Sequence, residues 1–318
     1  MKLRKVTIAL LAAIETLGAA TYDAGAVNQS AQPDIRTGAK GPAVARAQIL
    51  LDRAHFSCGE IDGEFGTNLE KAVTAFQHER RLPDSGAVDE PTWDALNMDR
   101  APALMTYTIA AEDVKGPFPQ SIPQDLMEQA ALPALSYTSP LEAMGERFHA
   151  APALLRALNP QAAFAAGDQV VVPNVLTLPP GKAARVVVSK SKSAVSAYDA
   201  AGRLLAFYAA TIGSQHDPLP VGEWKVRAVL HNPEFHYNPD LFWDARATDA
   251  KATIKPGPNN PVGLVWIDLS KEHYGIHGTP EPSRIGHATS HGCIRLTNWD
   301  ALELAAMVRP GTPAILEE

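Results

Sequence analysis

The stretch YGIHGTPEPSRIGHATSHGCIRLTNWDAL, residues 274–302, is the most informative part of the sequence. It contains one of the two cysteines of the chain and three histidines: Cys293, His277, His287 and His291. Around it, from residue 183 onward, short β-prone runs alternate with turn residues, and prolines between residues 217 and 282 mark long loops. We therefore expect a mainly β sandwich or barrel that carries its chemistry on loops.

The predicted strands of this region are residues 185–188, 194–198, 204–210, 222–230 and 264–269. The apolar pattern after residue 297 predicts a helix over residues 298–308, with Thr297 or Asn298 as its N-cap. The N-terminal dipole of this helix would favour a thiolate only within about one turn. Any base for the Cys293 thiol therefore has to come from a side chain.

Cys293 fits a thiol nucleophile better than a metal ligand. Free cysteine titrates near about pH 8.5, so a nucleophilic thiol needs a nearby base such as histidine. Gly292 allows close backbone approach, and consecutive N–H groups there can point at one oxygen. His287 and His291 have helical metal-ligand spacing, but two glycines bracket them, and no CxxC or HExxH motif accompanies them. We expect neither a metal nor a cofactor.

The ordered pattern of these residues is similar to that of the YkuD-type L,D-transpeptidase catalytic domain. That signature is a histidine, then Ser/Thr-His-Gly-Cys, one residue, Arg and later Asn. The matching positions here are His277, Ser290, His291, Gly292, Cys293, Arg295 and Asn298. Flanking PVGEW, GPNNPVG and GIHGT segments extend the resemblance over residues 183–316. A buried cysteine among locally satisfied histidines would explain fewer of these matches.

The resemblance implies that Cys293 attacks the carbonyl between the third residue of a peptidoglycan stem peptide and a terminal D-Ala. His277 is the implied base, and the backbone carbonyl of Gly278 the implied orienter of its ring. The backbone N–H groups of His291, Gly292 and Cys293 are the implied oxyanion donors, while the His291 side chain is an alternative shaper of the pocket. This chemistry requires no cofactor.

Several roles stay open at this level. Arg295 has two equal alternatives, binding a substrate carboxylate or bracing the loop through backbone carbonyls. Ser290 and Asn298 are expected to contribute to the substrate site chiefly as turn supports. An amine acceptor would give a crosslink or attach a lipoprotein or amino acid, whereas water would make the protein a carboxypeptidase or amidase. A non-catalytic wall-binding protein is the rival from another class.

Residues 34–98 predict a small domain of three helices. Apolar residues at helical spacing mark the first two, Val44, Ala47 and Leu51, then Leu69, Ala72, Val73 and Phe76. Asp89 is the expected N-cap of the third. The segments IDGEFG, KAVTAFQ, RLPDSG and PTWDAL resemble a peptidoglycan-binding domain. Because Leu69 replaces that family's usual threonine, we expect Thr67 or Asn68 to cap the second helix.

Residues 104–174 predict a strand, two helices and a strand, at residues 107–110, 139–150, 152–160 and 169–173. This βααβ order, with ALNP and AAGDQVVVP, resembles a LysM glycan-binding module. An insertion at residues 111–138 separates the first strand from the helices. The sequence supports glycan contact and a spacer role for this module equally. With a helical N-terminal domain, this βααβ module and a mainly β C-terminal domain, the whole chain is expected to be a multidomain α+β protein.

The N-terminal segment and the overall composition limit where the protein is expected to be located and which partners it can have. Three basic residues precede an apolar run over residues 6–14, which predicts a signal peptide at residues 1–26, cut near residues 18–20 or 24–26, and export to the periplasm or cell envelope. The run is too short for a permanent membrane span. A net charge of -7 excludes a general nucleic-acid surface. Cys58 is expected to be a core residue, with a disulfide to Cys293 as the alternative.

Overall fold

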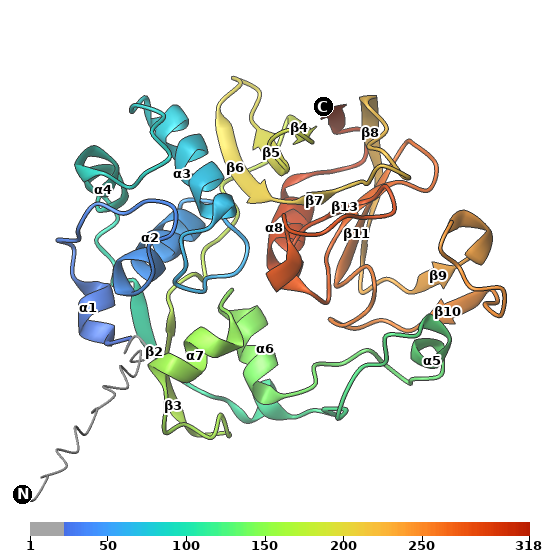
Figure 1. Cartoon of the computed structure of the whole chain (residues 1–318), viewed down its shortest axis with the longest axis horizontal. Helices are drawn as coiled ribbons and strands as arrows, with labels where there is room; N and C mark the ends of the chain where they lie inside the picture. The colour runs from blue at the N-terminus through green and yellow to red at the C-terminus, as the bar shows by residue number, and fades with distance from the viewer. Residues whose placement is uncertain (1–21) are drawn as a thin grey trace, which may run out of the picture.

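The computed structural model describes residues 22–318, so the predicted signal peptide lies outside the described part except for residues 22–26. A helical N-terminal region is followed by a small mixed module and a β-rich C-terminal domain (Figure 1). The predicted multidomain α+β fold is confirmed. Helix α1 (Ala24–Asn28) buries Val27. Within residues 22–318, no helix is long and apolar enough to cross a membrane.

The three helices of the N-terminal domain are those expected from the apolar periodicity: α2 (Pro42–Arg53), α3 (Thr67–Arg80) and α4 (Glu90–Leu96). Asp89 caps α4, because its side chain accepts a hydrogen bond from the backbone N–H of Thr92 at 3.2 Å. Cys58 is a free, buried thiol of the same hydrophobic core, as expected, and burial raises its pKa well above the ordinary value.

The predicted cap of α3 is wrong. Gly66 occupies the N-cap position, and no side chain caps the helix. Asn68 instead reaches out of its domain, because its Nδ2 donates to the backbone oxygen of Ile285 at 2.8 Å. Sequence position suggested a local hydrogen bond, whereas the structure uses the side chain to join two domains.

The middle module contains β2 (Leu104–Thr108), η1 (Ala111–Val114), α5 (Leu126–Ala130), α6 (Pro140–Arg147), α7 (Pro152–Leu158) and β3 (Gln169–Pro173). Strands β2 and β3 pair antiparallel, and the first strand begins before the predicted residues 107–110. Apolar side chains from both helices and both strands share one core, including Met144, Leu155 and Val170. The βααβ order is thus present, and the kinship to LysM stays a prediction.

The C-terminal elements are β4 (Arg185–Ser189), β5 (Ala194–Tyr198), β6 (Leu204–Ala209), β7 (Thr211–Ile212), β8 (Gly222–His231), β9 (Phe235–Tyr237), η2 (Pro239–Leu241), β10 (Ala252–Ile254), β11 (Val265–Leu269), β12 (Gly275–His277), η3 (Pro282–Arg284), β13 (Ile294–Arg295), α8 (Asn298–Met307) and β14 (Pro313–Glu317). With β1 (Phe56–Ser57), most strands form one sheet in the order β1-β6-β5-β4-β14-β8-β11-β12-β13-β7. Strands β9 and β10 pair separately.

This sheet folds back on itself at two places. Strand β8 pairs with β14 over residues 222–225 and with β11 over residues 226–231. Only Ala210 separates β6 from β7, although the two strands lie near opposite ends of the sheet order. The fold encloses a core to which α8 contributes Ala301, Leu304 and Met307. The expected N-cap Thr297 is confirmed, since it accepts from the backbone N–H of Asp300 at 3.1 Å.

The N-terminal domain is built into the same sheet. Strand β1 pairs in parallel with β6, with Phe56 opposite Phe207, and Phe207 belongs to the core of the N-terminal domain. Next to this pairing, Ser57 Oγ donates to a carboxylate oxygen of Asp300 on α8 at 3.0 Å. The N-terminal domain is therefore joined to the β-rich domain by strand pairing, by shared hydrophobic packing and by a side-chain hydrogen bond, and not by a linker alone.

Candidate active site

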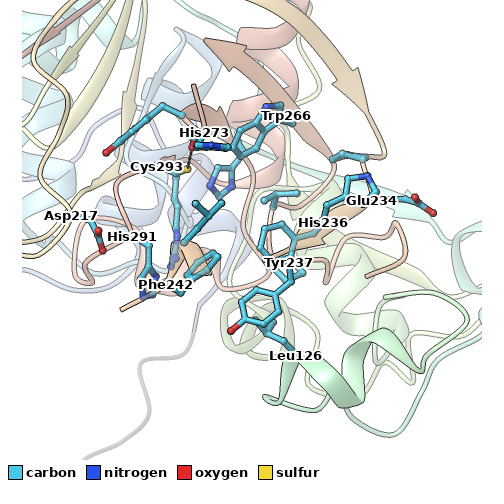
Figure 2. Close-up of a pocket in the computed structure, with 18 of the residues that line it drawn as sticks. Leu126, Asp217, Glu234, His236, Tyr237, Phe242, Trp266, His273, His291 and Cys293 are labelled. Carbon is cyan, nitrogen blue, oxygen red and sulfur yellow. Dashed lines mark hydrogen bonds between the residues drawn. The ribbon is translucent and has the colours of Figure 1, made fainter. Parts of the chain in front are cut away.

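Strand pairing brings together residues that are distant in sequence. Strands β12 and β13 run parallel, with His277 opposite Arg295, and Cys293 immediately precedes β13. All three line one cavity of about 1410 Å³, which is open to solvent. Figure 2 shows Cys293 at this cavity, with His291 and Phe242 beside it. The cavity thus holds the predicted nucleophile and base together with a positive charge.

The orientation of His277 is fixed from two sides. Its Nδ1 lies 2.7 Å from the backbone oxygen of Gly278, and the ring stacks on Trp266 at 5.3 Å between centroids. Because a carbonyl oxygen only accepts hydrogen bonds, Nδ1 carries the proton and Nε2 keeps its lone pair. Burial lowers the pKa of His277 to about 3, and the nearby Arg295 charge adds to this effect. The resting imidazole is therefore neutral.

The Cys293 thiol is also neutral at rest. Burial raises its pKa to about 11, although a backbone hydrogen bond from Gly275 and the charge of Arg295 oppose the rise. The Sγ atom lies 3.8 Å from the backbone oxygen of His273, which Figure 2 marks. With thiol and imidazole both uncharged, the thiolate has to form during the reaction by proton transfer to a base.

The loop that carries Cys293 is held by a side-chain hydrogen bond within the loop. Ser290 is buried, and its Oγ donates to the backbone oxygen of Cys293 at 2.5 Å. Gly292 has φ +93, and a Cβ there would lie 2.9 Å from the ring of Tyr274. Only glycine fits this position without displacing the tyrosine. Ser290 therefore acts as a turn support, and Gly292 keeps the backbone of the loop close to the cavity.

His291 contributes to the wall of the cavity through its side chain. Its Nε2 lies 3.0 Å from a carboxylate oxygen of Asp244, and its ring packs edge-on against Phe242 at 5.2 Å. Both partners belong to the long segment between β9 and β10. The side chain of His291 thus connects the cysteine loop with that segment, which matches the pocket-shaping alternative.

Arg295 is half-buried and lines the cavity. Within residues 22–318 its guanidinium forms no ion pair, and its buried Nε has no hydrogen-bond partner. Bracing of the loop through carbonyl contacts would have satisfied this donor. An unpartnered guanidinium nitrogen beside the predicted nucleophile is consistent with the other alternative, the binding of a carboxylate.

Asn298 lies behind the site and does not line the cavity. It is fully buried, and its Oδ1 accepts from the backbone N–H of Leu264 at 3.1 Å. Its Nδ2 donates to the Pro258 oxygen and to Glu146 Oε1 at 3.2 and 3.3 Å. A Cβ on Gly278 would come within 2.1 Å of Asn298 Oδ1. Asn298 therefore supports the chain next to His277, in keeping with the expected role as a turn support, and direct contact with the substrate stays a prediction.

Sequence reasoning missed several residues that line the cavity: Gln124, Leu126, Asp217, Tyr237, Trp266 and Tyr274. Trp266 offered a signal in the sequence, because it lies on a predicted strand. The structure adds that this strand places Trp266 in register with His277. Leu126 offered none, since it comes from the insertion of a different module and reaches the cavity only through tertiary packing.

Family comparisons agree with this geometry. The YkuD L,D-transpeptidase catalytic domain matches residues 183–316, and a peptidoglycan-binding domain matches residues 40–96. A Bacillus subtilis protein named for the L,D-transpeptidase YkuD is 30% identical over 177 residues, covering 54% of this chain and 90% of the relative. A Bacillus licheniformis protein of the same name is 59% identical over 58 residues, covering 18% of this chain and 35% of the relative.

A crystal structure of an L,D-transpeptidase from Xylanimonas cellulosilytica is 17% identical and covers 90% of this chain and 98% of its own, with a TM-score of 0.39. The chain thus spans between about a third and nine tenths of the length of the two Bacillus relatives. Because the chain is 30% identical to the Bacillus subtilis relative and covers 90% of its length, it belongs to the YkuD family of L,D-transpeptidases, and it carries an N-terminal peptidoglycan-binding domain.

Proposed function

We propose that this chain is a cysteine L,D-transpeptidase that acts on peptidoglycan stem peptides through a thioester on Cys293. The observation that carries the proposal is the shared cavity: Cys293, a neutral His277 and the unpaired Arg295 all line it. This set supplies a nucleophile, a base and an anion-binding group within one solvent-open site. Acyl transfer requires these groups, and the peptidoglycan-binding domain favours a stem peptide as the acyl donor.

In the first half-reaction, Cys293 Sγ attacks the carbonyl carbon between the third stem residue and D-Ala, while Nε2 of His277 accepts the thiol proton. The backbone N–H groups of His291, Gly292 and Cys293 are assigned to the developing oxyanion. The carbon–nitrogen bond then breaks, and His277 returns the proton to the leaving amine of D-Ala. A thioester remains on Cys293.

In the second half-reaction, an amine attacks the thioester, His277 takes a proton from the amine, and the carbon–sulfur bond breaks. The released sulfur then recovers a proton from His277. An amine on a second stem would give a crosslink, and an amine of a lipoprotein or amino acid would give attachment. Water as acceptor would give hydrolysis and is the alternative activity.

Arg295 gives substrate binding a direct effect on the base. Its charge contributes to the low pKa of His277, so a bound carboxylate that neutralises Arg295 would raise the basicity of Nε2. In the acyl-donor stem peptide, the terminal carboxylate of D-Ala is the anion suited to this role. Because Arg295 also lowers the pKa of the Cys293 thiol, the same bound carboxylate would make the thiol a weaker acid while it makes Nε2 a stronger base.

The proposed location is the periplasm or cell envelope, where peptidoglycan lies. Of the two predicted cleavage regions, residues 18–20 would leave α1 intact, whereas residues 24–26 would cut into this helix and its buried Val27. We therefore favour the first. Peptidoglycan binding by residues 40–96 would hold the β domain close to its substrate and raise the effective substrate concentration.

Product analysis tests this proposal. The protein lacking its first 20 residues is incubated with disaccharide-tetrapeptide, with and without an added amine, beside its Cys293→Ala variant. We expect D-Ala release and an amine-dependent product only with intact Cys293. Release of D-Ala without an amine adduct would establish hydrolysis instead of transfer, and no release at all would support the wall-binding alternative.

A further inference from the structure

The insertion at residues 111–138 leaves the middle module and runs to the β-rich domain (Figure 1). Its helix α5 packs against β10, and Gln124, Asp125 and Leu126 line the same cavity as Cys293. The matched catalytic domain begins only at residue 183, so this part of the cavity wall comes from outside it. We call residues 111–138 the strap.

The middle of the strap is tied to the segment between β9 and β10. Asp125 Oδ2 lies 2.6 Å from Nη2 of Arg246, which also holds Asp249 at 2.9 Å. Asp249 in turn accepts a hydrogen bond from the Tyr237 hydroxyl at 3.0 Å. Because Tyr237 lines the cavity too, this network connects the strap to a neighbouring part of the cavity wall.

The C-terminal end of the strap packs against the chain that follows β10. Leu135 is fully buried, its N–H donates to the Pro256 oxygen at 3.1 Å, and its oxygen accepts from the Asn259 N–H at 2.9 Å. Gly257 has φ +148, and a Cβ there would lie 2.2 Å from the Leu135 oxygen. The β-rich domain thus needs a glycine at 257 because the strap passes there.

The two arginines that line the cavity define its polarity. Arg295, beside Cys293, has no ion pair within the described residues 22–318, whereas Arg246, at the strap, already contacts two carboxylates. In Figure 2, Leu126 lies away from Cys293, with Tyr237 and Phe242 between them. At the strap, Arg246 is thus already paired and Leu126 offers an apolar contact, whereas the unpaired Arg295 beside Cys293 can receive a carboxylate.

We propose that the strap forms the outer wall of a distal subsite, in which Leu126 contacts the part of the stem peptide remote from the scissile bond. This inference rests on the proposed function for the identity of the ligand. The cavity of about 1410 Å³ exceeds the roughly 300 to 1,000 Å³ of most small-molecule sites, which leaves room for an extended substrate. The middle module thereby becomes a specificity element of the active site.

The test measures binding without turnover, by calorimetry in the Cys293→Ala background. The probes are disaccharide-tetrapeptide and an N-acetylated dipeptide that keeps only the third stem residue and D-Ala. We expect Leu126→Ala to raise the Kd of the tetrapeptide about tenfold and to leave that of the dipeptide unchanged. Asp125→Asn, which releases Arg246, should act in the same direction. Glu128→Ala, on the exposed side of α5, is the matched control.

Thermal unfolding by circular dichroism checks that each variant stays folded. Equal weakening of both probes, or no weakening of the tetrapeptide, would overturn the strap proposal. Release of D-Ala by the protein with intact Cys293 is measured separately. Leu126-dependent binding without D-Ala release would defeat the proposed function and leave the subsite standing, whereas release with Leu126-independent binding would defeat the subsite alone.

Discussion

The active site and the junction of the three domains both bury titratable side chains, but of the two regions only the active site contains a titratable side chain with an unpartnered polar atom. The junction cluster consists of Asp52, His55, Ser57, Glu146, His149, Tyr208, Asp300 and Glu303, and each has a hydrogen-bond partner. In the active site, Arg295 has an unpartnered Nε and faces a cavity. Burial alone therefore does not mark a reactive site; a buried, unpartnered charged donor beside a candidate nucleophile does.

The junction cluster joins all three parts of the chain. Asp52 comes from α2, His149 follows α6, and Asp300 lies on α8. His149 Nδ1 lies 3.0 Å from Asp52, and its ring stacks on Trp299 at 5.1 Å. Burial, together with the charge of Asp52, raises the pKa of Asp300 well above its ordinary value. Satisfied hydrogen bonds of this kind stabilise a domain arrangement instead of supporting chemistry.

The largest expected effect follows from His277→Asn. Asparagine keeps an N–H that can donate to the Gly278 oxygen, but it removes the base at Nε2. We expect the rate of D-Ala release to fall about 10³-fold, the scale of general-base catalysis, with little change in the urea midpoint. His287→Asn, an exposed histidine of the same region, is the control. A variant at position 277 that keeps most of the wild-type rate would contradict the base role.

Asp52→Ala should show the opposite balance, with lost stability and retained chemistry. The change leaves the buried His149 without its carboxylate partner. Removing one member of a buried ion pair costs about 3 to 5 kcal/mol in the free energy of unfolding. Urea denaturation measures the loss, and D-Ala release per folded molecule should match the wild type.

Asp84→Ala is the matched control, because Asp84 pairs with His78 on the surface, where the side chains are 47% and 79% exposed. We expect a loss below about 1 kcal/mol there. Equal losses for the Asp52 and Asp84 variants would show that the junction contributes no more than a surface pair.

Glu146→Gln should change how stability depends on pH. Burial raises the pKa of Glu146 from 4.5 to about 8; the nearby Glu142 and Glu60 also raise it, whereas Asn298 and His149 oppose the rise. The folded protein therefore keeps this proton while the unfolded chain loses it near pH 4.5. The stabilisation is complete below pH 4.5 and is lost as pH rises toward 8.

Between pH 5 and 8 we expect this effect to lower the free energy of unfolding by about 3 to 4 kcal/mol in the wild type. The Glu146→Gln variant should lack that part of the slope, and the exposed Glu128→Gln variant should keep it. Urea titrations at four pH values would check this expectation, and parallel pH profiles for all three proteins would refute it.

Gly292→Ala should produce the smallest effect, and Gly311 provides a matched comparison. The two glycines have φ +93 and +91, but a Cβ would meet Tyr274 at 2.9 Å only at position 292, because nothing lies within 4 Å of it at position 311. Both alanine variants should lose about 1 kcal/mol of stability through left-handed backbone strain. Only Gly292→Ala should also slow acylation, about tenfold, through the displaced cysteine loop. Equal acylation rates in the two variants would remove the special role of Gly292.

Local sequence patterns predicted much of this molecule. Strand β5 has the predicted limits 194–198, and Asp89 and Thr297 cap the helices that they precede, because alternation and capping depend on neighbouring residues. The signature from His277 to Asn298 also placed the nucleophile and the base in one cavity. These features are encoded within short segments.

Contacts between segments that are distant in sequence could not be predicted from these local patterns. Asn68 bonds to Ile285 instead of capping its helix, and Asn298 supports the backbone behind the site instead of entering it. Leu126 reaches the cavity from a segment that the sequence marks only as an insertion. Each of these roles depends on which elements pack together, and no periodicity or spacing within one segment contains that information.

Intact-protein mass spectrometry tests the central claim, the thioester on Cys293, most directly. The protein lacking its first 20 residues is mixed with a carbapenem, a reactive acylating probe, beside its Cys293→Ala and Cys58→Ala variants. The account predicts one adduct with the full mass of the probe on the wild type and on Cys58→Ala, and none on Cys293→Ala. No adduct on the folded, reduced wild type, or an adduct that survives in Cys293→Ala, would contradict it.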